Sequence, residues 1–110
     1  MKVFKFGGAS VKDAPALRNT VSIINSHAEH RLLVVVSAMG KTTNAIERVL
    51  AQFRNQKDYK QEIAAIRQYH ADVVKNLFSD GHTLLSRLDQ ILSEMESKLD
   101  HEQDFDQVYD

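Results

Sequence analysis

The sequence predicts an α/β fold in which parallel strands, joined by a crossover helix, precede an antiparallel helical hairpin. Residues 3–6 are rich in strand-forming side chains and predict a short β-strand. Residues 32–36 form a continuous apolar, β-branched run, which is typical of a strand buried on both faces of a parallel sheet. Beyond residue 57 the apolar residues recur at helical spacing, which predicts helices for the rest of the chain.

Composition narrows the class of protein. A chain of 110 residues is one domain or part of one, and its 43% hydrophobic content indicates a packed chain. The absence of cysteine excludes a disulfide framework and a thiolate metal site. A net charge of −1 gives no reason to expect nucleic acid binding, and no apolar run is long enough for a membrane span or a signal peptide. We expect a cytoplasmic protein, and the five histidines show no metal-ligand spacing.

The first helix follows the first strand and leads to the second. Asp13 is a plausible N-cap, and Pro15 is tolerated in the first turn. The side chains expected on the buried face of this helix are Leu17, Val21, Ile24 and Ala28. Residues 29–31 form a polar turn into residues 32–36, and such a crossover between parallel strands is almost always right-handed.

Three further helices are expected. The first runs from Thr43, a natural cap, to Arg54, with an apolar stripe formed by Ala45, Ile46, Val49, Leu50 and Phe53. The second spans residues 58–78, and a glycine in the turn at 79–81 ends it. The third carries a heptad seam formed by Leu85, Leu88, Leu92, Met95 and Leu99. This seam is either the core of an antiparallel hairpin over residues 58–99 or a contact between chains.

The last residues, 100–110, read as an acidic, solvated tail. Phe105, Val108 and Tyr109 are spaced through this tail and suggest packing that it does not complete. The open edges and uncovered faces of a two-stranded sheet favour self-association, so a homo-oligomer is expected.

The first candidate site follows the first strand directly. Residues 5–11 read Lys-Phe-Gly-Gly-Ala-Ser-Val, so a strand ends in two glycines and a helix opens beside a serine. Glycine permits tight turns and close backbone approach, and the arrangement suits a phosphate. An ordinary strand-to-helix turn is the alternative for a Gly-Gly pair.

The second candidate site follows the second strand. Residues 37–44 read Ser-Ala-Met-Gly-Lys-Thr-Thr-Asn and lead into an amphipathic helix. Gly40, Lys41 and Thr42 imitate the end of a P-loop, but that motif needs a glycine where this chain has Val35. No GxGxxG fingerprint of a dinucleotide site occurs either.

Together the two segments resemble aspartate kinases. Those enzymes open with Lys-Phe-Gly-Gly-Thr-Ser-Val, from which only Ala9 departs, and they carry Val-Ser-Ala, a variable turn and Thr-Asn after their second strand. The resemblance implies an amino-acid-kinase-type αβα sandwich, in which ligands lie outside the carboxyl ends of the strands. It also implies phosphoryl transfer from ATP, bound with Mg²⁺, to the side-chain carboxylate of aspartate.

The resemblance assigns roles to six residues. Lys5 would contact the phosphates and neutralise the charge that develops there. Gly7 and Gly8 would offer backbone N–H groups to the phosphates, and Ser10 would add a hydroxyl. Ser37 and Thr43 match positions that hold aspartate. No residue is expected to bind a metal directly.

Each of these residues also has a structural interpretation. Lys5 could be a solvated strand lysine, Ser10 and Thr43 could be helix caps, and Ser37 could be a turn residue. Two other functions stay open: an amino-acid kinase with another substrate, or a non-catalytic helical interaction module built on the leucine seam.

The resemblance covers nearly the whole chain but only the leading part of such enzymes. The chain ends just before a segment that also contacts aspartate in those enzymes. We therefore expect residues 1–110 to be an incomplete N-terminal portion of the kinase domain, with a substrate and phosphate segment at 1–55. We expect this portion to be inactive by itself.

Overall fold

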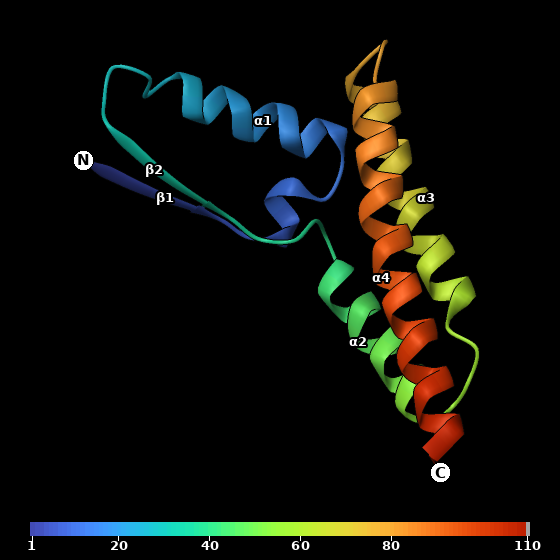
Figure 1. Cartoon of the computed structure of the whole chain (residues 1–110). Helices are drawn as coiled ribbons and strands as arrows, with labels where there is room; N and C mark the ends of the chain where they lie inside the picture. Colours follow the sequence, from blue (N-terminus) through green and yellow to red (C-terminus); the bar gives the residue numbers. More distant parts are fainter. Residues whose placement is uncertain (110) are drawn as a thin grey trace. The chain divides into compact units, whose positions relative to one another are not determined.

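The computed structural model describes residues 1–109, with side chains for residues 1–102. The elements along the chain are β1 (Lys2–Phe6), a short 3-10 helix η1 (Gly8–Val11), α1 (Ala14–Asn25), β2 (Leu32–Val36), α2 (Thr42–Arg54), α3 (Lys60–Leu77) and α4 (His82–Tyr109) (Figure 1). The chain divides into two compact units, the first being Met1–Thr43 and the second beginning at Asn44. The predicted α/β class, with strands first and helices after, is confirmed.

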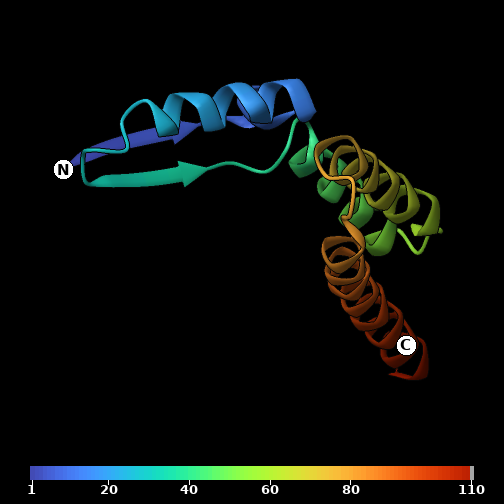
Figure 2. The same cartoon turned by 90° about the horizontal axis from the view of Figure 1, so that it is seen from above.

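The first unit is a β-α-β unit. β1 and β2 pair in parallel, with Lys2 opposite Leu32 and Phe6 opposite Val36. The pairing continues past the strands, because the amide of Ser37 donates to the carbonyl of Phe6 over 2.9 Å. α1 runs alongside the two strands in both views (Figures 1 and 2).

The sheet is covered on one face. Phe6 is buried, and the ring of Phe4 lies 4.9 Å from that of His27 beyond the end of α1. Side chains of the other face are exposed: Val3 by 60%, Leu33 by 49% and Val35 by 45%. The prediction that residues 32–36 are buried on both faces is therefore wrong for this chain, because a single helix packs on a single face.

α1 begins as predicted, and part of its predicted apolar face packs inward. The Asp13 carboxylate accepts a hydrogen bond from the amide of Ala16 over 2.9 Å, so this N-cap is confirmed. The helix ends at Asn25, which leaves Ala28 outside it, and Val21 is 51% exposed. Thr20 is buried instead, at 4% exposure. Leu17 and Ile24 are partly buried, so the predicted face is confirmed at these two positions and wrong at Val21 and Ala28.

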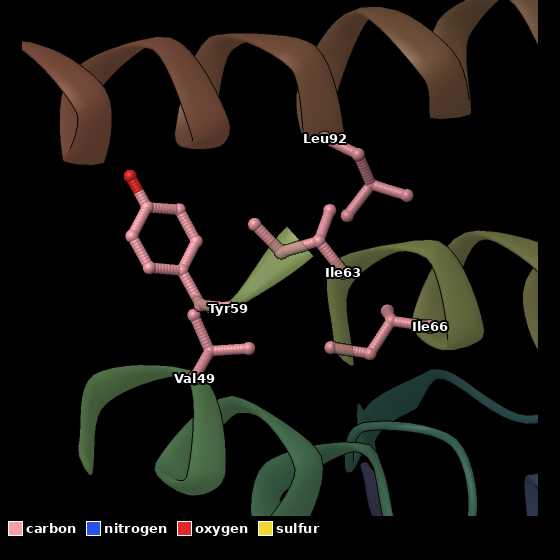
Figure 3. Packing of buried hydrophobic residues seen from close by; sticks show 5 residues of the cluster. All are labelled: Val49, Tyr59, Ile63, Ile66 and Leu92. Atoms are coloured by element: carbon pink, nitrogen blue, oxygen red, sulfur yellow. The ribbon is translucent and has the colours of Figure 1, made fainter. Parts of the chain in front are cut away.

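The second unit packs three helices around an apolar core. The buried side chains come from α2, the start of α3 and α4, and they are Val49, Tyr59, Ile63, Ile66 and Leu92 (Figure 3). The partly buried residues around them include three further residues of the leucine seam and are Ala45, Phe53, Leu88, Met95 and Leu99. The leucine seam thus forms core within the chain, as one of its two interpretations predicted.

Ion pairs show that α3 and α4 are antiparallel. Lys60, at the start of α3, lies 2.8 Å from Glu96 and 3.0 Å from Asp100. Arg67, two turns further along α3, lies 3.2 Å from Asp89, which precedes Glu96 in α4. The predicted antiparallel hairpin is therefore confirmed.

Gly81 lies in the turn of the hairpin. A glycine is favoured there because there is little space for a side chain, and not because the backbone conformation requires one. Gly81 has no positive φ, in contrast to the usual residue after a helix. A Cβ added to it would lie 2.8 Å from Cγ1 of Val74. The glycine therefore lets the start of α4 approach α3 closely.

α4 runs on to Tyr109, so a helix occupies the segment expected to be a solvated tail. The side chain of Asp100 belongs to the hairpin, since it accepts hydrogen bonds from Tyr59 and Lys60. The side chains of Phe105, Val108 and Tyr109 lie outside the described residues.

Candidate active site

The candidate site is built from the two loops that follow β1 and β2. Both loops leave the carboxyl edge of the parallel sheet, where α/β proteins bind their ligands. The amide of Gly40 donates to the carbonyl of Gly8 over 3.0 Å. The structure therefore brings the Gly-Gly segment and the Ser37–Thr43 segment into direct contact within the first unit.

Gly8 and Gly7 have different structural reasons to be glycine. A Cβ on Gly8 would lie 2.5 Å from the carbonyl oxygen of Gly40 and 3.2 Å from that of Ala38. Both obstacles are backbone atoms, so a side chain at Gly8 would push the loops apart. A Cβ on Gly7 would meet nothing within 4 Å, and its φ of −78° is open to any residue.

Ser10 lies on η1, between the two strands' ends and α1. Its amide donates to the carbonyl of Gly7 over 3.0 Å, and its own carbonyl accepts from the hydroxyl of Thr20 over 2.8 Å. Val11, next to it, is only 1% exposed and anchors η1. The side chain of Ser10 is exposed and does not cap α1, because Asp13 takes that position.

The second loop turns at Gly40, whose φ of 54° favours glycine. Thr42 begins α2 and is 7% exposed, and its hydroxyl donates to the carbonyl of Met39 over 2.6 Å. Thr43, predicted as a possible cap, lies inside the first turn of α2 with its side chain exposed. Ser37 is also exposed, so both hydroxyls proposed for aspartate are accessible.

Lys5 lies near the carboxyl end of β1, opposite Val35. Side chains alternate along a strand, so Lys5 shares the exposed face of the sheet with Val3 and Leu33. The lysine is exposed, as either interpretation of it requires. It stands one residue before Phe6, whose carbonyl holds the start of the second loop at Ser37.

The sequence pattern missed three residues of this region. Thr20 and Thr42 donate hydrogen bonds to main-chain carbonyls of the two loops, and the Gly40 amide donates to the carbonyl of Gly8. For Gly40 a signal existed, since a glycine between a strand and a helix often marks a positive φ. For Thr20 none existed, because its partner lies ten residues away in another element.

Shifted pKa values occur at the hairpin. Burial, followed by the hydrogen bond to Asp100, raises the pKa of Tyr59 to about 12. The hydrogen bond from Tyr59, followed by that from Lys60, lowers the pKa of Asp100. Hydrogen bonds to Glu96 and Asp100 raise the pKa of Lys60. These groups connect α3 to α4.

The described part of the chain has neither a membrane-spanning helix nor a metal cluster. No helix there is long and apolar enough to cross a membrane. Among the same residues, no three or more His, Asp or Glu side chains converge as a metal site would require.

Comparison with known proteins gives consistent matches. The sequence model of the amino acid kinase family matches residues 1–103. Aspartokinase 1, chloroplastic, of Arabidopsis thaliana is 31% identical over 93 residues, which are 81% of this chain and 16% of that protein. The chloroplastic bifunctional aspartokinase/homoserine dehydrogenase 2 of the same plant is 32% identical over 90 residues, 81% of this chain and 10% of that protein.

A solved structure shares the fold. The aspartate kinase of Clostridium acetobutylicum matches with a TM-score of 0.70 at 24% identity, over 87% of this chain and 23% of that one. The chain thus spans about a sixth or less of the length of these curated relatives.

Proposed function

The chain belongs to the amino acid kinase family, and from this premise we propose that the protein carrying it is an aspartate kinase. It would transfer the γ-phosphoryl group of ATP to the side-chain carboxylate of L-aspartate and form 4-phospho-L-aspartate. The support is twofold: the curated relatives are named aspartokinases, and both motifs typical of those enzymes lie at one edge of the sheet.

One observation carries the proposal. The hydrogen bond from Gly40 to Gly8 joins the loop proposed for phosphate to the loop proposed for aspartate. Phosphoryl transfer depends mostly on positioning and on stabilisation of charge, and donor and acceptor must be held about 3–3.5 Å apart. Loops that touch through their backbones hold two ligands at a fixed separation.

The roles follow from the placement of the residues. Lys5 would neutralise charge that develops on the transferred oxygens, and Gly7, Gly8 and Ser10 would bind phosphate oxygens. Ser37 and Thr43 would donate hydrogen bonds to aspartate.

We propose that Mg²⁺ arrives with the nucleotide and keeps its ligands from phosphates and water. The groups at the two loops fit an ion held by the nucleotide. The loops present hydroxyl and amide groups, and no three acidic or histidine side chains cluster among the described residues. The ion would neutralise phosphate charge when bound.

Lysine variants test the proposal. Lys5→Ala in the full-length protein should lower kcat with aspartate by about 10²–10³, the usual loss when a charge-stabilising donor is removed. Lys2→Ala is the matched control, because Lys2 is exposed at the other end of the same strand. Equal activity of the two variants would contradict the role of Lys5.

A second amino-acid kinase activity remains the alternative. Turnover with glutamate, N-acetylglutamate or UMP in place of aspartate would keep the fold and overturn the roles of Ser37 and Thr43. A helical interaction module is less favoured, because the leucine seam packs inside the chain.

Further properties of the intact protein follow as proposals. 4-Phospho-L-aspartate would feed the synthesis of lysine and threonine. We propose that the 110-residue chain alone has no kinase activity and that it forms homo-oligomers through the exposed face of its sheet, where Val3 and Leu33 are uncovered. A monomeric mass by light scattering would contradict the assembly.

We also propose a cytoplasmic location. The names of the curated relatives include the word chloroplastic, so a plastid is the alternative. Cell fractionation that recovers the protein in plastids would overturn the proposal.

A further inference from the structure

Two buried hydroxyl groups hold the loops of the site from behind. Thr20 and Thr42 are the buried polar residues of the described chain, at 4% and 7% exposure. Each donates to a main-chain carbonyl of one loop, Thr20 to that of Ser10 over 2.8 Å and Thr42 to that of Met39 over 2.6 Å. The two threonines come from different helices, α1 and α2.

Hydrogen bonds hold both ends of the peptide group between Met39 and Gly40, and Thr42 supplies those at the carbonyl end. The Met39 carbonyl accepts from the hydroxyl of Thr42 and also from its amide, the latter over 3.0 Å. The amide of the same peptide group belongs to Gly40 and donates to Gly8. Rotation of this peptide would break all three hydrogen bonds, so Thr42 determines where the Gly40 N–H points.

Thr20 is unusual for a threonine inside a helix. Such hydroxyls generally bond a carbonyl of their own helix or point to solvent. Thr20 instead reaches η1 and binds the carbonyl of Ser10. Valine has nearly the same shape and would fill the same space, but it would leave a partly buried carbonyl without this donor.

We propose that Thr20 and Thr42 are positioning residues for the two halves of the site, Thr20 for the phosphate half and Thr42 for the aspartate half. This inference rests on the proposed function for its assignment to substrates. The mechanical part does not: Thr42 keeps the Gly40 peptide against Gly8, and Thr20 keeps Ser10 in place.

Hydrogen exchange on the 110-residue chain tests the mechanical part without any activity. In Thr42→Val the Gly40 amide should exchange about tenfold faster, since the partly buried Met39 carbonyl loses its hydroxyl donor. Thr42→Ser should restore the slow exchange, and Thr83→Val, at an exposed position in α4, should leave it unchanged. Slow exchange at Gly40 in Thr42→Val would overturn the proposal.

Kinetics of the full-length protein test the division between substrates. Thr42→Val should raise KM for aspartate about tenfold with KM for ATP nearly unchanged, and Thr20→Val should do the reverse. The serine variants should recover most of each loss. Equal effects of both variants on both substrates would contradict the division. Absence of turnover in the unmodified protein would instead refute the proposed function, while the exchange result would still decide the role of Thr42.

Discussion

The two units of the chain differ in how completely each buries its apolar side chains. The helices from Asn44 onward enclose Ile63 at 0% exposure, whereas the sheet of the first unit leaves Val3, Leu33 and Val35 between 45% and 60% exposed. The first unit nevertheless carries every residue proposed for the site. Main-chain hydrogen bonds join its loops and Phe6, Val11 and Ala14 are buried in it, whereas the second unit buries a larger cluster around Ile63. The proposed site thus lies in the unit with the smaller set of buried apolar side chains.

Truncation of the core should give the largest effect on stability. Ile63→Ala removes a fully buried side chain and should lower the free energy of unfolding by about 2–5 kcal/mol. Val35→Ala, on the exposed face of the sheet, should cost less than about 1 kcal/mol. Urea denaturation followed by far-ultraviolet circular dichroism measures both. Similar losses would remove the contrast between the units.

A side chain between the loops should have the next largest effect. Gly8→Ala places a Cβ against the Gly40 carbonyl and should destabilise the first unit by about 1–3 kcal/mol. Gly7→Ala meets open space and should change stability by less than about 0.5 kcal/mol. Amide exchange in β2 reports the difference, because it follows the first unit alone. If both variants exchange alike, the close approach of the loops is incorrect.

Alkaline pH should weaken the hairpin by a smaller amount. Tyr59 ionises near pH 10 when unfolded and at about 12 when folded, so its contribution is complete below pH 10 and is lost as the pH rises toward 12. Urea midpoints should therefore fall over that interval. Lys60, whose pKa is also raised, adds to the same fall.

Tyr59→Phe separates the contribution of Tyr59 to the alkaline loss of stability from that of Lys60. It removes the hydrogen bond to Asp100 and should cost about 1 kcal/mol at neutral pH. It should also make the fall above pH 10 shallower. A variant with the same alkaline profile as the unmodified chain would show that Tyr59 does not titrate with unfolding.

The sequence predicted those features that depend on local pattern. The two strands, the Asp13 cap and the antiparallel hairpin are each encoded within a few consecutive residues or by a regular spacing. The two motifs were expected at the same edge of the sheet, and the Gly40–Gly8 hydrogen bond confirms that they meet. The roles of all six proposed site residues stay predictions.

Features that depend on a distant partner could not be predicted. Thr20 is polar, so hydrophobic spacing did not predict its burial, which the carbonyl of Ser10, ten residues earlier, makes possible by accepting its hydrogen bond. The exposure of β2 likewise depends on what packs on the sheet, which a strand's own residues do not specify. Helix α4 continues through the acidic segment, and Asp100, at the start of that segment, pairs with Lys60 of α3.

The most direct test of the account is ATP-dependent acyl-phosphate formation by the full-length protein, with hydroxylamine to trap the product. Aspartate, glutamate, N-acetylglutamate and UMP would be offered in parallel. We predict turnover with aspartate alone, since the exposed hydroxyls of Ser37 and Thr43 lie on the loop that Gly40 joins to Gly8. Turnover with another substrate, or with none of them, would contradict the assignment of these loops to an aspartate kinase.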